Sequence, residues 1–205
     1  MKDELIHINK SIAAGIAIGI GGTAYLATGN PWIFPIGLFM VCYFGLNLFT
    51  GKVCYVLDSV KFPGLISMWF FNTLAAYLTG LVIAACKPGL VEKARGMVEV
   101  KLNESFSIIP LAFLCNVLIF VAVDTYRISD TVYPKGYKGL ILPIGLIFAT
   151  ATFVACGFEH CIANAFYFGV AGEFSGSALL FLLANTIWNL IGGVAAKELL
   201  FKKYN

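Results

Sequence analysis

Long apolar stretches separated by short polar ones are the dominant pattern of this 205-residue chain. A membrane-spanning helix needs roughly 17–25 mostly apolar residues, and the stretches are of this order or longer. They predict six spans, at residues 12–28, 34–60, 65–86, 108–123, 139–171 and 178–196. The pattern therefore predicts an all-α membrane protein, with residues 1–205 forming a single transmembrane domain.

Two of these stretches carry interruptions. Segment 34–60 is interrupted at residues 50–52, and segment 139–171 near residues 157–160. These are the middle segments of two halves with three spans each, so the halves must enter the membrane in opposite orientations. The plan is that of two inverted three-helix repeats with the second and fifth helices broken. Broken helices in matching positions indicate a permeation site near the bilayer midplane.

Composition supports the membrane class. Sixty per cent of the residues are apolar or aromatic and only 12% are charged, against about 25% in soluble domains. With a net charge of only +3, this excludes a cytosolic enzyme, a disordered protein and a nucleic-acid binder. The first stretch is too long for a signal peptide, so we expect it to be retained. No C-x-x-C motif occurs, and the six cysteines predict neither disulfides, a metal site nor another cofactor.

The positive charges predict an orientation. An even number of spans places both termini on one side, and that side collects ten Lys or Arg against four on the other. The ten are Lys2, Lys10, Lys52, Lys61, Arg127, Lys135, Lys138, Lys197, Lys202 and Lys203. The four are Lys87, Lys93, Arg95 and Lys101. This bias predicts a multi-pass protein of the cell membrane with both termini in the cytoplasm.

Glu159 and His160 are two ionisable residues inside an otherwise apolar run. A charged side chain at the centre of a bilayer costs at least about 2.5–3.5 kcal/mol, which favours a role in a permeation pathway. The alternative is a neutral pair satisfied by packing alone. Neighbouring side chains on a helix point about 100° apart. We therefore expect His160 to face a pore and Glu159 to contact neighbouring groups.

Several further polar residues lie within or beside the predicted spans. Intramembrane asparagine often serves as interhelical glue worth about 0.6 kcal/mol. The asparagines are Asn72, Asn116, Asn164, Asn185 and Asn189. Asn164 and Asn189 stand beside breaks, where they either cap freed backbone groups or orient His160. Lys101 is either a solvated lysine or an attractor of anions in a vestibule.

Three motifs resemble the formate/nitrite transporter family, which includes formate, nitrite and hydrosulfide channels. The first combines Phe-Pro-Ile-Gly-Leu at residues 34–38 with Asn-Leu-Phe-Thr-Gly at residues 47–51. The second is the run at residues 153–164 around Glu159 and His160, and the third is Asn-Leu-Ile-Gly-Gly at residues 189–193. Lys101 and Cys115-Asn116 also fit the family pattern. Asn47 replaces the usual acidic residue and Lys52 the frequent asparagine, which makes this loop more positive.

The resemblance implies a homopentamer of aquaporin-like protomers, each with its own pore. Two apolar constrictions would enclose a central chamber. The inner one is assigned to Leu38 and Leu48 with Phe49 beside them, and the outer one to Phe34, Phe153 and Ile119. The chamber would be lined by Thr50, His160 and Asn189, and the polar network around it formed by Lys101, Glu159, Asn116 and Asn164.

The expected function is a channel for small monovalent anions of weak acids, coupled to protons through His160, and not an enzyme. Formate is the expected solute, with nitrite, hydrosulfide, acetate and lactate as alternatives. Its partners would be this anion and the lipid bilayer, and not a nucleic acid. Two other functions remain open: a channel for neutral small solutes, and a membrane anchor subunit that transports nothing.

Overall fold

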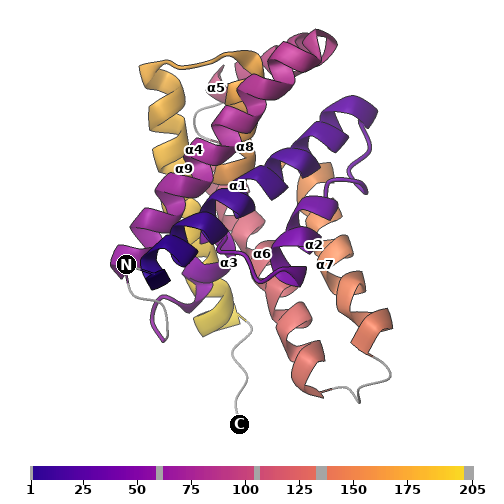
Figure 1. Ribbon diagram of the computed structural model, residues 1–205, viewed down its shortest axis with the longest axis vertical. Helices are drawn as coiled ribbons and strands as arrows, with labels where there is room; N and C mark the ends of the chain where they lie inside the picture. Colours follow the sequence, from indigo (N-terminus) through magenta and orange to yellow (C-terminus); the bar gives the residue numbers. More distant parts are fainter. Residues whose placement is uncertain (1, 59–61, 104–106, 133–137, 201–205) are drawn as a thin grey trace.

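The computed structural model describes residues 2–58, 62–103, 107–132 and 138–200, without the side chains of residues 128–143. All secondary structure in this part of the chain is helical, which confirms the all-α prediction (Figure 1). Among the described residues, four helices are long and apolar enough to cross a membrane. They are α1 (Lys2–Thr28), α4 (Phe62–Cys86), α6 (Ile108–Val132) and α9 (Gly176–Ala195), the last continued by the π-helix η3 (Ala196–Leu200).

The second and fifth apolar stretches each form two helices with a break between them. The second consists of α2 (Ile36–Tyr43) and α3 (Phe49–Lys52), which ends in a 3₁₀ turn at Val53–Tyr55. The fifth consists of α7 (Lys138–Ala155) and α8 (Cys161–Ala171). The prediction of a break near residues 157–160 is confirmed, because Gly157 there has a φ of 66°. Such a left-handed backbone is open to glycine at little cost.

The break in the second stretch lies earlier than predicted. Residues 50–52, the expected interruption, are helical and belong to α3. The chain leaves the helix at residues 44–48, where Gly45 has a φ of 59°. The prediction placed the break at the polar residues around Gly51. Gly51 is instead a buried residue of α3, and Gly45 makes the turn.

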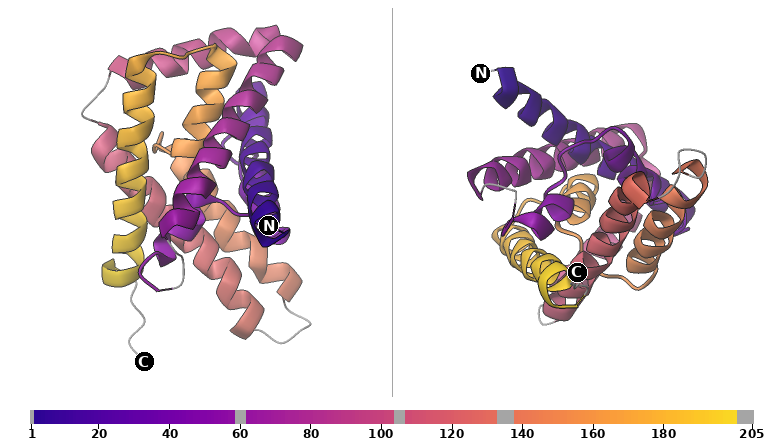
Figure 2. Two further views of the ribbon diagram at one scale, coloured as in Figure 1. Left: turned by 60° about the vertical axis from the view of Figure 1, so that its left-hand side comes forward. Right: turned by 90° about the horizontal axis from the view of Figure 1, so that it is seen from below.

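The polar stretch between the third and fourth spans contains a helix, α5 (Val91–Asn103), preceded by a 3₁₀ turn at Pro88–Leu90. It lies across one end of the bundle, while the start of α1 and the end of α9 lie toward the other (Figures 1 and 2). We call these ends the α5 side and the terminal side. Of the residues in the charge count, Lys61, Lys135, Lys202, Lys203 and the side chain of Lys138 lie outside the described part of the chain.

Small residues allow the helices to approach closely. A Cβ added at Gly15 of α1 would collide with the backbone carbonyl of Asn72 in α4. The same holds for Gly80 of α4 against the backbone of α8, and for Gly192 of α9 against α6. Large apolar side chains such as Phe70, Val82 and Leu180 are exposed on the outside. This distribution is expected for a bundle that faces lipid or other subunits.

Candidate functional site: two clamped helix breaks and a buried histidine

Asn189 of α9 holds the break between α7 and α8. Its Oδ1 accepts a hydrogen bond from the backbone N–H of Cys161 at 2.9 Å. Its Nδ2 donates to the carbonyls of Ala112 and Glu159 at 2.7 and 2.8 Å. All hydrogens of this amide are therefore used on backbone groups. The prediction that Asn189 lines the chamber remains untested, but its amide has no hydrogen left to donate to a solute in this conformation.

Asn72 of α4 holds the break between α2 and α3 in the same way. Its Oδ1 accepts from the N–H of Phe49 at 2.8 Å. Its Nδ2 donates to the carbonyls of Ser11 and Asn47 at 2.7 and 2.9 Å. The residue pattern alone marked Asn72 only as interhelical glue, so this role was missed.

The two clamps correspond contact by contact. In each, an asparagine of the third helix of a half binds the N–H that opens the second half-helix and the carbonyl two residues before it. It also binds a carbonyl of the first helix of that half. Such a match is expected of two inverted repeats. The signal in the sequence was the shared position of Asn72 and Asn189 in the third span of each half.

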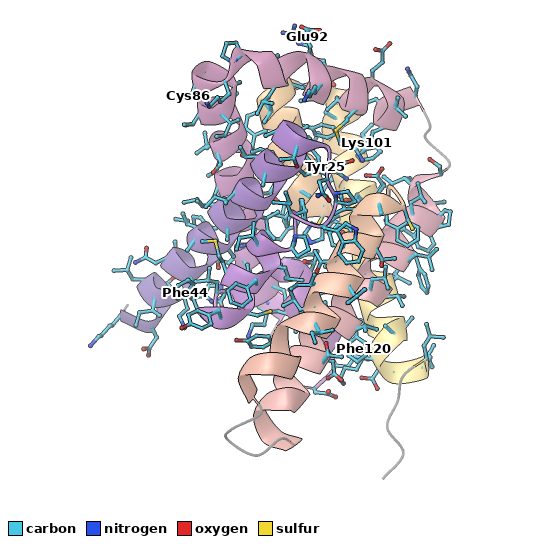
Figure 3. The ribbon with its side chains drawn as sticks, turned by 90° about the vertical axis from the view of Figure 1, so that its right-hand side faces the viewer. Tyr25, Phe44, Cys86, Glu92, Lys101 and Phe120 are labelled. Atoms are coloured by element: carbon cyan, nitrogen blue, oxygen red, sulfur yellow. The ribbon has the colours of Figure 1, made fainter. Side chains whose placement is uncertain are left out.

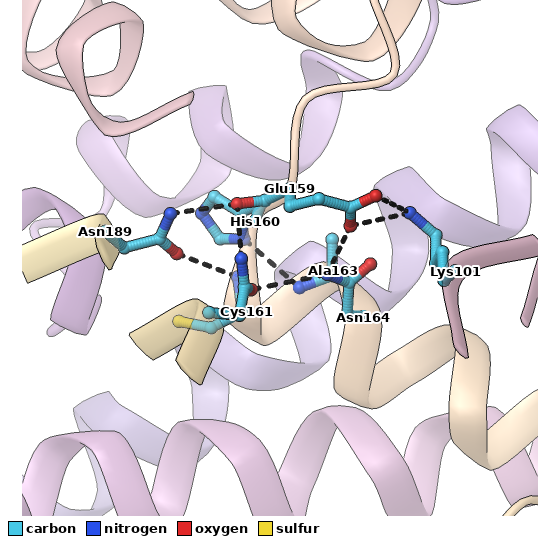
Figure 4. A network of polar contacts seen from close by, with 8 residues as sticks. Lys101, Glu159, His160, Cys161, Ala163, Asn164 and Asn189 are labelled. Carbon is cyan, nitrogen blue, oxygen red and sulfur yellow. Dashed lines mark hydrogen bonds and ion pairs between the residues drawn. The ribbon is translucent and has the colours of Figure 1, made fainter. Parts of the chain in front are cut away.

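His160 caps the N-terminus of α8. Its Nδ1 accepts a hydrogen bond from the N–H of Ala163 at 3.1 Å (Figure 4). Its Nε2 lies 2.9 Å from the hydroxyl oxygen of Thr50. Because an N–H donor faces Nδ1, the neutral ring carries its proton on Nε2 and donates it to Thr50. The Thr50 hydroxyl then has its own hydrogen left to donate.

Glu159 points away from His160 into a separate polar network. Its two carboxylate oxygens each accept from Nζ of Lys101 at 2.7 Å, and Oε2 also accepts from Nδ2 of Asn164 at 2.7 Å (Figure 4). Asn185 donates to the backbone carbonyl of Glu159 at 2.8 Å. Glu159 therefore contacts neighbouring groups, as expected, whereas the expectation that His160 faces a pore remains a prediction. The helix assumed for it is absent, because His160 has extended backbone angles, φ −104° and ψ 114°.

Aromatic rings pack directly against the histidine. The ring of Phe153 stacks on His160 with centroids 5.7 Å apart and planes 14° apart. Phe34 meets Phe153 edge-on, with the two ring centroids 5.5 Å apart. His160 is only 2% exposed and Thr50 is fully buried. These residues, assigned to the outer constriction and to the chamber, therefore form one closed aromatic and polar core.

Cavities lie on both sides of this core. On the terminal side, a cavity of about 290 Å³ is lined by both inner-constriction leucines, Leu38 and Leu48, and by Lys52 and Arg127. On the α5 side, a cavity of about 490 Å³ is lined by Lys101, Glu159 and residues of α5 and α6. Figure 3 shows the two ends, with Lys101 near the α5 end and Phe44 toward the other. A solute can pass between these vestibules only if the core side chains move.

Three other assigned residues, Phe49, Ile119 and Asn116, each have different surroundings. Phe49 lines a different, apolar cavity between α4 and α9. Ile119 is buried in α6, and its assignment to the outer constriction remains a prediction. Asn116 donates to the backbone carbonyl of Thr50 at 3.1 Å, while its Oδ1 has no hydrogen-bond partner among the described residues.

These features define a class of protein: a multi-pass helical membrane protein with inverted repeats, whose broken helices meet at a buried polar core between two vestibules. Residues 5–201 match the family model for the formate/nitrite transporter, and the chain belongs to this family. The resemblance found in the sequence motifs is thereby confirmed.

Similar proteins are channels or transporters, not enzymes. The chain is 30% identical over 194 residues to "Formate channel FocA" of Haemophilus influenzae, covering 80% of this chain and 66% of that protein. It is 29% identical over 186 residues to "Formate channel FocB" of Escherichia coli, covering 76% and 63%. The chain thus spans slightly less than two thirds of the length of these relatives.

Solved structures share the fold. A "Pentameric formate channel with formate bound" superposes with a TM-score of 0.77 at 23% identity, covering 94% of this chain and 93% of that one. An "FNT family ion channel" superposes with a TM-score of 0.75 at 19% identity, covering 94% of this chain and 87% of that one.

Proposed function

We propose that this protein is a membrane channel for small monovalent anions of weak acids, with formate as its main solute. The observation that carries the proposal is the His160–Thr50 pair, buried behind Phe34 and Phe153 between two vestibules. The formate channels among the relatives support formate, and the pentameric structural neighbour supports a homopentamer with one pore in each protomer. The charge bias supports cytoplasmic termini.

The apolar core selects the neutral form of the solute. Moving a bare anion out of water into such surroundings costs many kcal/mol, whereas the protonated acid avoids most of this cost. The anion therefore takes up a proton at the core and passes Phe34 and Phe153 as the neutral acid. The free hydrogen of the Thr50 hydroxyl donates to the carbonyl oxygen of the acid on the way. Nitrite, hydrosulfide, acetate and lactate are further candidates on the same chemical grounds.

Proton coupling through His160 has a structural condition. The neutral ring holds one proton, on Nε2, and its Nδ1 accepts from Ala163. To pass a proton to the solute, His160 must first take up a second proton on Nδ1. This breaks the cap on α8, so proton uptake at His160 changes the end of the helix that closes the core.

Two substitutions separate this coupling from the capping role. His160→Asn keeps a side-chain acceptor for the N–H of Ala163 but cannot titrate. His160→Phe removes both. Uptake of labelled formate into proteoliposomes, with and without a proton gradient, should lose its pH dependence in both variants, while only His160→Phe should also lose folded protein. A parent-like pH profile in His160→Asn would contradict coupling at His160 and leave the channel function intact.

The capping role of His160 favours one competing function, a channel for neutral solutes in which the histidine is structural. Competition among formate, nitrite, hydrosulfide, acetate and lactate distinguishes the two functions. In an anion channel each transported anion slows the uptake of labelled formate, and uptake rises as the pH falls. No formate uptake by the purified parent at any pH would contradict the proposed function.

A further inference from the structure

The terminal-side vestibule carries an excess of positive charge. Lys52 and Arg127 both line its cavity, and none of the described residues that line it is an aspartate or a glutamate. Leu38 and Leu48 line the same cavity, so the two cations stand at the approach to the apolar core. Any anion that reaches this core from the terminal side must pass them.

The two cations differ in their surroundings. The guanidinium of Arg127 lies over the ring of Tyr55, 4.2 Å from its centroid, and the Tyr55 hydroxyl donates to Asp124 at 3.3 Å. Arg127 is thus held near a carboxylate. Lys52 is exposed at the end of α3, and within the described part of the chain no carboxylate lies at ion-pair distance from it. Lys10 and Arg127 are close enough to act on its charge.

In the α5-side vestibule the charges that line the cavity are balanced. Its lysine, Lys101, is matched by Glu159 through two contacts of 2.7 Å, and Asn164 binds the same carboxylate. The side chains of the pair are only 13% and 7% exposed. The charges of this pair cancel at short range, so the charged residues that line this cavity offer an anion little net attraction. The two mouths of the pore are therefore electrostatically unlike.

We propose that Lys52 makes the terminal-side vestibule a docking site for a small monovalent weak-acid anion, in front of the Leu38–Leu48 constriction. The proposal rests on the proposed function and deepens it. An anion held there relieves the repulsion that Lys10 and Arg127 exert on Lys52. Lys101 is not the main attractor of anions, because its charge is already matched.

The sequence carries the signal for this site. Lys52 stands where the family often has asparagine, so the docking charge belongs to this chain. It should act on one side only: anions approaching from the terminal side should saturate transport at a lower concentration than anions approaching from the α5 side. Since the vestibule is open to water, salt should weaken this difference.

The flux experiment uses proteoliposomes carrying the full chain, sorted by affinity capture of an N-terminal tag, so that the terminal side faces outward. At low ionic strength, Lys52→Gln should raise the half-saturating concentration for labelled formate influx about fivefold. The change should shrink at high salt. Lys52→Arg should behave as the parent. The matched control is Lys87→Gln, which removes an equal charge from the exposed residue just beyond α4 and should change nothing.

A readout without flux uses Cys42, a half-buried thiol that lines the same cavity. In a background with Cys86 and Cys156 replaced by serine, Cys42 is modified by anionic and cationic thiol reagents of equal size. Lys52→Gln should lower the ratio of anionic to cationic rates severalfold, and formate should slow the anionic reagent in the parent.

The outcomes are distinct. An unchanged half-saturating concentration in Lys52→Gln, or an equal rise for Lys52→Arg or Lys87→Gln, would overturn the docking site. So would an unchanged ratio at Cys42. A parent that carries no formate but shows the charge-dependent ratio at Cys42 would overturn the proposed function and keep the docking site.

Discussion

Replacing Asn72 by leucine removes the clamp on the first helix break while keeping a side chain of similar volume. The N–H of Phe49 and the carbonyl of Asn47 lose their side-chain partner, while the carbonyl of Ser11 loses one bond but keeps its bond within α1; all three now lie 2.7–2.9 Å from the amide. Asn72 is completely buried, so water does not replace it. The perturbation therefore tests whether this asparagine holds the break together.

The magnitude follows from the number of groups left unsatisfied. Each buried donor or acceptor without a partner costs about 1–3 kcal/mol. The two groups left without a partner give roughly 2–6 kcal/mol before relaxation, and we expect about 3 kcal/mol because the chain can shift around the break. For a chain of this size, about 3 kcal/mol corresponds to a fall in the unfolding midpoint of roughly 6–12 °C.

The assay is thermal unfolding of the purified protein in detergent, followed by intrinsic fluorescence. Asn189→Leu should give a loss of the same size, because the second clamp has the same three contacts. Asn9→Leu is the matched control, since Asn9 is exposed on α1 and should change the stability by less than about 0.5 kcal/mol.

If Asn72 only made an ordinary interhelical hydrogen bond, Asn72→Leu would cause a smaller loss of unfolding free energy. An intramembrane asparagine in that role contributes about 0.6 kcal/mol on average. A loss near this value for Asn72→Leu, or a large loss for Asn189→Leu alone, would refute the clamp and the equivalence of the two halves.

Three further predictions concern the core and its packing. Lys101→Met leaves the buried carboxylate of Glu159 without its cation and should lower the free energy of unfolding by about 3–5 kcal/mol, at low and high salt alike. The double variant Lys101→Met with Glu159→Gln should recover most of this loss in the same unfolding assay. Gly80→Leu pushes a side chain into the backbone of α8 and should cost about 1–3 kcal/mol or more, measured by unfolding. Phe153→Ala removes the ring between Phe34 and the histidine and should speed formate flux in proteoliposomes while reducing discrimination against lactate; slower flux would contradict a constriction there.

The fifth stretch illustrates how far residue patterns reach. Gly157 and the ionisable pair Glu159 and His160 marked the break correctly. Ionisable residues are costly inside an apolar span, so their presence there indicates an interruption of the helix. The second stretch misled: Gly51 looked like the interruption, yet Gly45 makes the turn. Which glycine adopts a left-handed φ depends on where α1 and α4 hold the chain, and no local pattern carries that information.

The pair Glu159 and His160 shows the same limit. Their separation into two environments was expected from helical geometry, but the break puts His160 in an extended conformation. What separates them is the partner each finds: Lys101 on α5 for the carboxylate, Thr50 on α3 for the imidazole. Those partners lie 58 and 110 residues away along the chain.

The sequence by itself determined the class of this protein, its family and the polar residues that matter, because hydrophobic length, charge bias and short motifs are local properties. Only the tertiary structure decided how those residues are used. Asn72 and Asn189 became matching clamps, the charge of Lys101 was cancelled, and Lys52 was left without a carboxylate partner among the described residues at one mouth. Each of these outcomes depends on hydrogen-bond or ion-pair distances between segments remote in the chain, which exist only once the helices have packed.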